Sequence, residues 1–128
     1  MDKWTDIHRN TNISETVDWI LKNHPWSGSR NFTRVFKIYG INRESHILEA
    51  GCSTAKIGLA TALRTGCKLT CLDYYEEGLR LANEVYKELK DRIGKTLKVE
   101  FVKGDIQKLD YKDQFDLVFN EGVIEHWQ

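Results

Sequence analysis

The feature that most constrains the fold of this sequence is a change of hydrophobic period that begins at His46. From there, short apolar segments of about five residues alternate with longer segments of helical periodicity. The predicted strands are His46–Ala50, Lys68–Leu72, Leu97–Val102 and Phe115–Asn120. The predicted helices run from about Thr54 to Thr65 and from about Tyr75 to Ile93, with Gly66 and Gly94 at their ends. Strands that alternate with helices in this way are typical of βαβ units on a parallel sheet.

The composition of the strands indicates their order. The runs Ile47-Leu48 and Leu117-Val118-Phe119 are continuously apolar, which suits central strands covered on both faces. The segment Leu97–Phe101 instead alternates apolar with charged side chains, which suits a half-exposed edge strand. A sheet ordered third, second, first, fourth would satisfy these preferences. We therefore predict an α/β fold with a Rossmann-like parallel sheet and flanking helices, truncated after the fourth strand.

The residues before His46 are expected to form a helical prelude. Asn12 and Glu15 are placed like a capping box, and Pro25 ends the helix that follows. The apolar face of this first helix consists of Ile13, Val17, Ile20 and Leu21. A second helix is predicted over Ser29–Tyr39, with Gly40 as its C-cap. Aromatic residues that suit either a lid or core packing are Trp4, Trp19, Trp26 and Phe32. We expect a prelude at residues 1–44 and a βαβ domain at residues 45–128.

Composition narrows the partners and the compartment. In these 128 residues, 19 Lys and Arg balance 19 Asp and Glu, so no net charge attracts nucleic acid or an anionic membrane. The apolar runs are far shorter than a bilayer span, and the N-terminus lacks a signal-peptide profile, so we expect a cytoplasmic protein. The three cysteines, Cys52, Cys67 and Cys71, include no CxxC pair. We expect reduced structural thiols and no metal site.

Polar and glycine-containing segments follow all four predicted strands in the order that a nucleotide-cofactor site requires. Gly51 and the small residues after it allow a tight turn and a close approach to a ligand. Asp73 ends the second strand about 20 residues later, where a carboxylate can accept hydrogen bonds from ribose hydroxyls. The segments Gly104-Asp105-Ile106 and Asn120-Glu121-Gly122 follow the third and fourth strands. Singly, each element equally suits a turn or a surface carboxylate, but together they favour a cofactor site.

From Ile47 to about Trp127, these motifs resemble, in order, those of the class I S-adenosylmethionine (SAM) dependent methyltransferases. The resemblance implies SAM as cofactor. Glu49, Gly51, Cys52 and Ser53 would border its methionine portion, and Asp73 would bind its ribose diol. Tyr74 would lie against the adenine, with Asp105 and Ile106 at the adenine edge. Asn120 and Glu121 would close the cleft near the sulfonium.

The glycine loop departs from the pattern of this family at two positions. Ser53 and Ala55 stand where the family most often has glycine, although both residues are small. A G-x-G-x-x-G dinucleotide loop would need glycine in place of Ser53 and Lys56, which weighs against a nicotinamide cofactor.

The implied activity is transfer of the SAM methyl group to an unidentified acceptor, for which a small molecule is one class. His126 is the candidate base, although a lone histidine is more often structural. The alternative is a non-catalytic module that binds SAM or its nucleoside, because the sequence stops at Gln128, where family members continue. SAM and S-adenosylhomocysteine (SAH) are the implied partners. The free edge of the fourth strand is expected to associate, in a homodimer or with a C-terminal segment.

Overall fold

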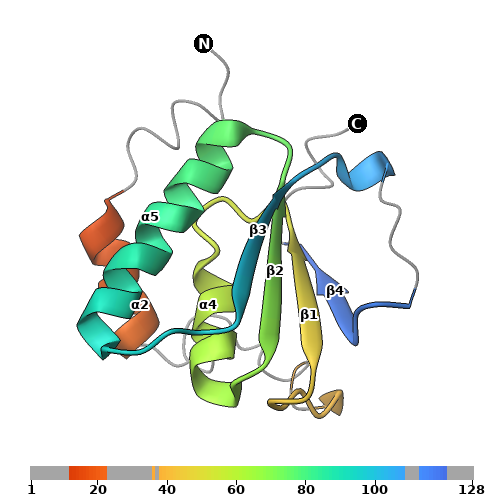
Figure 1. The fold of residues 1–128 in the computed structure, drawn as a ribbon, viewed down its shortest axis with the longest axis horizontal. Helices are drawn as coiled ribbons and strands as arrows, with labels where there is room; N and C mark the ends of the chain where they lie inside the picture. The colour runs from red at the N-terminus through yellow and green to blue at the C-terminus, as the bar shows by residue number, and fades with distance from the viewer. Residues whose placement is uncertain (1–11, 23–35, 37, 109–112, 121–128) are drawn as a thin grey trace.

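A computed structural model of the chain describes residues 12–22, 36, 38–108 and 113–120. It contains a four-stranded parallel sheet in the order β3-β2-β1-β4, as the sequence predicted (Figure 1). The strands are β1 (His46–Ala50), β2 (Lys68–Asp73), β3 (Val99–Lys103) and β4 (Leu117–Phe119). The helices are α2 (Ile13–Lys22), α4 (Lys56–Thr65) and α5 (Glu76–Ile93), with a 3-10 turn η1 at Ile106–Lys108. The chain therefore has the expected Rossmann-like α/β fold.

Helices α2, α4 and α5 of the described residues gather on one face of the sheet in two layers (Figure 1). Helices α4 and α5 pack on the strands, and α2 packs on these two helices. Since α4 lies between the sheet and α2, all of its residues from Ile57 to Ala62 are buried. Helix α5 buries one stripe, made of Leu81, Ala82, Val85, Tyr86 and Leu89. Burial of a leucine- or valine-sized side chain contributes about 1.5 to 3 kcal/mol, so these stripes hold the helices on the sheet.

The two faces of the sheet carry separate apolar clusters. Ile47, Leu69 and Cys71 point to the helices and join the larger core. Leu48, Ala50 and Leu72 form a smaller cluster with the partly buried Val102 and Phe115. The alternation of side chains along each strand produces this division.

The N-terminal helix α2 is capped and tied to the domain. The Glu15 backbone N–H donates to Asn12 Oδ1 at 3.0 Å, which confirms the predicted cap. Arg64 of α4 donates to the Ile20 carbonyl at 2.9 Å, and Arg92 of α5 donates to Asp18 at 2.6 Å. These contacts join the prelude to two helices that lie far from it in the sequence.

The second predicted helix, Ser29–Tyr39, lies mostly outside the described residues. Its end is described: Phe36 is helical, and Gly40 adopts a left-handed conformation with φ of 63°. The Ile41 N–H donates to the Phe36 carbonyl at 3.0 Å, which closes the helix end around Gly40. Gly40 thus has the C-cap geometry that the sequence indicated.

Strand β3 begins at Val99 and not at Leu97 as predicted. Both backbone groups of Leu97 bond to the Tyr86 hydroxyl, which accepts from its N–H at 3.0 Å and donates to its carbonyl at 3.1 Å. A side chain from α5 therefore satisfies Leu97 in place of the strand ladder.

Strand β4 is shorter than the predicted Phe115–Asn120. The Phe115 ring packs on His46 with centroids 4.5 Å apart, and the Asp116 carboxylate accepts from the His46 N–H at 2.7 Å. Within the described residues β4 is an edge strand, and Val118 is 53% exposed. The apolar run at 117–119 is therefore not covered on both faces in this part of the chain, and its interpretation as a central strand is wrong here.

Candidate functional site

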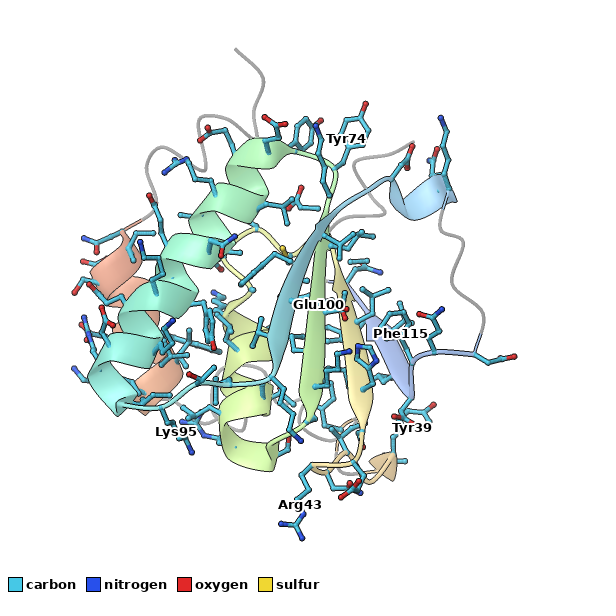
Figure 2. The ribbon with its side chains drawn as sticks, in the orientation of Figure 1. Tyr39, Arg43, Tyr74, Lys95, Glu100 and Phe115 are labelled. Atoms are coloured by element: carbon cyan, nitrogen blue, oxygen red, sulfur yellow. The ribbon has the colours of Figure 1, made fainter. Side chains whose placement is uncertain are left out.

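The carboxyl ends of the parallel strands bring the sequence motifs to one edge of the sheet. The segment Gly51–Ala55 follows β1, Asp73 ends β2, and Gly104 follows β3. Figure 2 shows Tyr74 at this edge, while Arg43 and Lys95, which precede β1 and β3, lie at the opposite end. The edge formed by the carboxyl ends of strands is where open α/β sheets bind ligands.

The loop after β1 contains three residues with left-handed backbone. These are Gly51, Ser53 and Ala55, with φ of 67°, 48° and 57°. For a residue with a side chain this conformation costs about 1 to 2 kcal/mol. Ser53 and Ala55 stand at the two loop positions where the family most often has glycine. The loop therefore keeps its left-handed turns at the cost of backbone strain in these two residues. Because Ala55 is left-handed, α4 begins at Lys56, two residues after the predicted start.

Asp73 is the residue around which this loop is organised. Its side chain is 6% exposed. One carboxylate oxygen accepts from the Ser53 N–H at 3.0 Å, and the other accepts from the Tyr75 N–H at 2.9 Å. A Cβ added at Gly78 of α5 would overlap this carboxylate. Since each carboxylate oxygen has two lone pairs, both oxygens keep an acceptor position.

Glu49, at the end of β1, connects the loop to the first turn of α4. Its side chain is 4% exposed, and Oε1 accepts from the Gly58 N–H in the first turn of α4 at 2.9 Å. A carboxylate at a helix N-terminus satisfies a free N–H and interacts favourably with the helix dipole. Gly58 permits this contact because a Cβ there would lie 2.5 Å from Glu49 Oε1. The sequence indicated Glu49 but did not reveal its dependence on Gly58, nor that of Asp73 on Gly78.

An open cavity of about 660 Å³ lies beside Asp73, at the ends of β2 and β3. Its lining consists of Tyr74, Tyr75, Glu76, Glu77, Lys103, Gly104 and Asp105. The rings of Tyr74 and Tyr75 meet edge to face, with centroids 5.2 Å apart. The structure thus brings two predicted residues, Tyr74 and Asp105, into one cavity with an aromatic wall and acidic side chains. Sequence reasoning did not identify Tyr75, Glu76, Glu77 or Lys103.

Asp105 and Ile106 form the turn that closes this side. Asp105 Oδ1 accepts from the Gln107 N–H at 2.8 Å, and Ile106 opens η1. Lys103, at the end of β3, forms an ion pair with Glu76 at 3.1 Å. Asn120 directly follows Phe119, which is in register with Glu49, so it lies at the same edge.

Cys52 lies in the loop as a buried thiol. A hydrogen bond with Cys71 and burial raise the pKa of Cys52 well above its usual value, so the thiol stays protonated near neutral pH. All three cysteines are free and buried. Their environment is that of structural residues.

Several residues proposed from the sequence lie outside the described part of the chain. These are Glu121, His126, Trp4, Trp26 and Phe32. Trp19 is described: it packs on the core, and the Lys56 ammonium lies 5.1 Å from its ring centroid. In the described segments, no helix is long and apolar enough to cross a membrane.

Comparisons with solved structures find the same fold in other proteins, among them SAM-dependent methyltransferases. One match is the MccD protein, 26% identical, with a TM-score of 0.59; the alignment covers 75% of this chain and 41% of that one. Another is from Methanococcus maripaludis and is described as a candidate SAM-dependent methyltransferase. It is 16% identical with a TM-score of 0.69, covering 98% of this chain and 51% of the other. A SAM-dependent methyltransferase from Aquifex aeolicus is 19% identical with a TM-score of 0.55, covering 87% and 57%.

The chain spans about half the length of these solved proteins. No curated protein matches the sequence. The sequence profile of the family described as "Methyltransferase domain" matches residues 48–128, which include all four strand ends and the glycine loop. The chain therefore belongs to the methyltransferase-domain family and has the class I SAM-dependent methyltransferase fold.

Proposed function

We propose that this chain binds SAM at the carboxyl ends of its strands and takes part in transferring the methyl group to an acceptor. The observation that carries the proposal is the orientation of Asp73, whose oxygens are fixed by the glycine loop and by the start of α5. This carboxylate stands beside a cavity with an aromatic wall. A nucleoside needs both features, an acceptor for its ribose hydroxyls and a surface for its base.

The proposed contacts follow from these positions. The remaining lone pairs of Asp73 would accept from the two ribose hydroxyls. Tyr74, which is 49% exposed, offers its ring to the adenine, and Asp105 offers a carboxylate to the exocyclic amine. The backbone from Gly51 to Ser53 borders the methionine portion, while Glu49 acts indirectly by holding the loop. As the resemblance implies, we assign the adenine edge to Ile106 and the part of the cleft near the sulfonium to Asn120 and Glu121.

When bound, SAM supplies a methyl group activated by a positively charged sulfur. The contribution of the chain is to hold that group in position and to keep it away from water. Positioning of this kind lowers a barrier by about 7 to 11 kcal/mol. His126 is proposed as a base for acceptors that must lose a proton. The acceptor is unidentified, and small molecules are the first class to test.

A binding module without turnover is the second candidate. A ligand held at the described edge would need only the loop, Asp73 and the cavity, and all of these are present. The two candidates share the same cofactor site and differ in turnover.

Calorimetric titration of the chain with SAM, SAH and NAD tests the shared site. We expect saturable binding of SAM and SAH and no binding of NAD. A preference for NAD, or no binding of either sulfur-containing ligand, would refute the proposal. A second measurement follows formation of SAH from SAM in the presence of candidate small-molecule acceptors. Binding without SAH formation would favour the module over the enzyme.

A further inference from the structure

Lys103 and Asp73 are neighbours on adjacent strands whose side chains turn toward the same helix. Their Cα atoms are partners in the parallel ladder of β2 and β3. The Asp73 carboxylate lies against Gly78 of α5, and the Lys103 ammonium pairs with Glu76, the first residue of α5, at 3.1 Å. A cation therefore stands one strand away from the buried carboxylate, but a different carboxylate holds it.

Glu76 is well suited to hold this cation. It lies in the first turn of α5, where a negative side chain interacts favourably with the helix dipole. Its side chain is 80% exposed and that of Lys103 is 57% exposed, so the pair can separate at small energetic cost. Both residues line the cavity. The partner of Lys103 thus decides whether a free cation is presented to a ligand there.

The charge beside Asp73 discriminates between two kinds of ribose. Free hydroxyls donate hydrogen bonds, so they favour an uncompensated carboxylate. A phosphate is a strong acceptor with a charge near −2, so Asp73, Asp105 and Glu76 would repel it and a free lysine would attract it. Because Glu76 neutralises Lys103, the charge at the cavity is negative and favours free hydroxyls over a phosphate.

We propose that Glu76, by holding Lys103, increases the preference of this site for nucleosides with free ribose hydroxyls over those with a ribose phosphate. This inference rests on the proposed nucleoside site. It adds a selection rule that depends on two surface residues outside the glycine loop. Glu76 acts through Lys103 and is therefore a positioning residue.

The test compares adenosine, adenosine 2′-monophosphate and SAH by calorimetry on four proteins: the natural chain, Glu76→Gln, Glu76→Gln with Lys103→Met, and Glu84→Gln. Glu84 is the matched control, because it also forms an ion pair on α5, with Arg80 at 2.8 Å, but does not line the cavity. In Glu76→Gln we expect the preference for adenosine over its 2′-phosphate to fall by about three- to fivefold, as for the loss of one exposed ion pair. The double variant should regain the original preference, and Glu84→Gln should keep it.

The outcomes separate this inference from the proposed function. Unchanged discrimination in Glu76→Gln, with SAH still bound, would overturn the role of Glu76 alone. Failure of the natural chain to bind adenosine and SAH would overturn both proposals. An equal change in the double variant and in Glu76→Gln would also refute the inference, because Lys103 must carry the effect. Raising the salt concentration should reduce the difference between the variants, since exposed charges are screened.

Discussion

The backbone N–H of Ser53 donates to the carboxylate of Asp73 at 3.0 Å, which joins the end of β2 to the loop that follows β1. Neither group is near the other in the sequence. The bond fixes the position of the carboxylate relative to the strained loop. A substitution in either is therefore expected to change the conformation of the other.

Asp73→Asn should weaken SAM binding by about 1 to 3 kcal/mol, or about 5- to 150-fold in Kd. The amide keeps the shape but turns an NH2 group toward one of the two backbone N–H donors, from Ser53 or Tyr75. Calorimetric titration with SAM measures the loss, and thermal unfolding checks that the variant is folded. The control is Asp91→Asn at an exposed position of α5. Equal affinity in both variants would remove Asp73 from the ribose site.

Gly58→Ala should destabilise the fold by about 1 to 3 kcal/mol, although alanine is normally the better helix former. The added Cβ would lie 2.5 Å from Glu49 Oε1 and 2.8 Å from Leu69 Cδ1. Urea unfolding measures the change. Asn83→Ala, at an exposed position in the middle of α5, gives the ordinary effect of alanine in a helix. A stabilised Gly58→Ala variant would contradict the packing of Glu49 against α4.

Ser53→Gly should stabilise the chain by about 0.5 to 1 kcal/mol. Relief of the left-handed strain is worth about 1 to 2 kcal/mol, and the greater freedom of glycine in the unfolded chain offsets part of it. Ser53→Ala is the matched control, because it removes the hydroxyl and keeps the strain. Urea midpoints of the three proteins decide the matter: Ser53→Ala should not gain the stability that Ser53→Gly gains.

His46 is expected to make stability fall below about pH 6.5, the ordinary pKa of histidine. Burial, and secondarily the charge of Lys68, lower the pKa of His46 in the folded chain despite the opposing charges of Glu100 and Asp116. The unfolded chain therefore binds more protons between the two pKa values, and stability is lost as the pH falls through that window. Unfolding midpoints between pH 8 and pH 5 should decline less in His46→Gln than in the natural chain. Parallel profiles would contradict the assignment.

The pH experiment also probes a hydrogen bond that the His46 ring makes. Its Nε2 lies 2.7 Å from Thr70 Oγ1, and the Thr70 hydroxyl donates to Glu100 at 2.7 Å. Since that hydroxyl hydrogen is used, Nε2 must carry the proton it donates to Thr70. The bonds run from His46 of β1 through Thr70 of β2 to Glu100 of β3. Figure 2 labels Glu100 and Phe115, the residue whose ring packs on His46. The glutamine amide can replace the donor but does not titrate.

Val118→Lys should reduce self-association of the chain. Val118 is 53% exposed on β4, an edge strand of the described sheet, and a lysine at such an edge opposes pairing with another strand. Sedimentation at several protein concentrations measures the mass. Asn83→Lys adds the same charge to α5 and controls for general repulsion. A natural chain that sediments as a monomer throughout would refute the predicted association.

The strands and their order could be predicted because the strands are short segments separated by helical ones. The continuous apolar run of β1 differs from the alternation of apolar and charged side chains in β3. The start of α4 could not be predicted, because the left-handed conformation of Ala55 depends on the turn that binds the loop to β2. The start of β3 was predicted too early because the partner of Leu97 is the Tyr86 hydroxyl, a side chain of the preceding helix. The hydrophobic periodicity of a segment does not reveal a contact with a side chain of another helix.

The candidate site divides in the same way. The positions of Asp73, Tyr74 and Asp105 follow from the rule that strand ends bind ligands. The roles of Gly58 and Gly78 depend on the approach of helices to buried carboxylates, and the pairing of Glu76 with Lys103 joins α5 to β3. These relationships arise from packing between distant segments, so only the folded chain reveals them.

The two arginines that hold α2 have a consequence for protein engineering. Val17 and Ile20 of α2 are fully buried in the same core as Ile57 and Leu59 of α4. A shortened protein that begins at residue 45 would retain every motif residue. It would, however, expose the apolar outer face of α4 and deprive Arg64 of the Ile20 and Leu21 carbonyls. A protein shortened to the residues that match the family is therefore expected to aggregate, and a minimal binding domain should include α2.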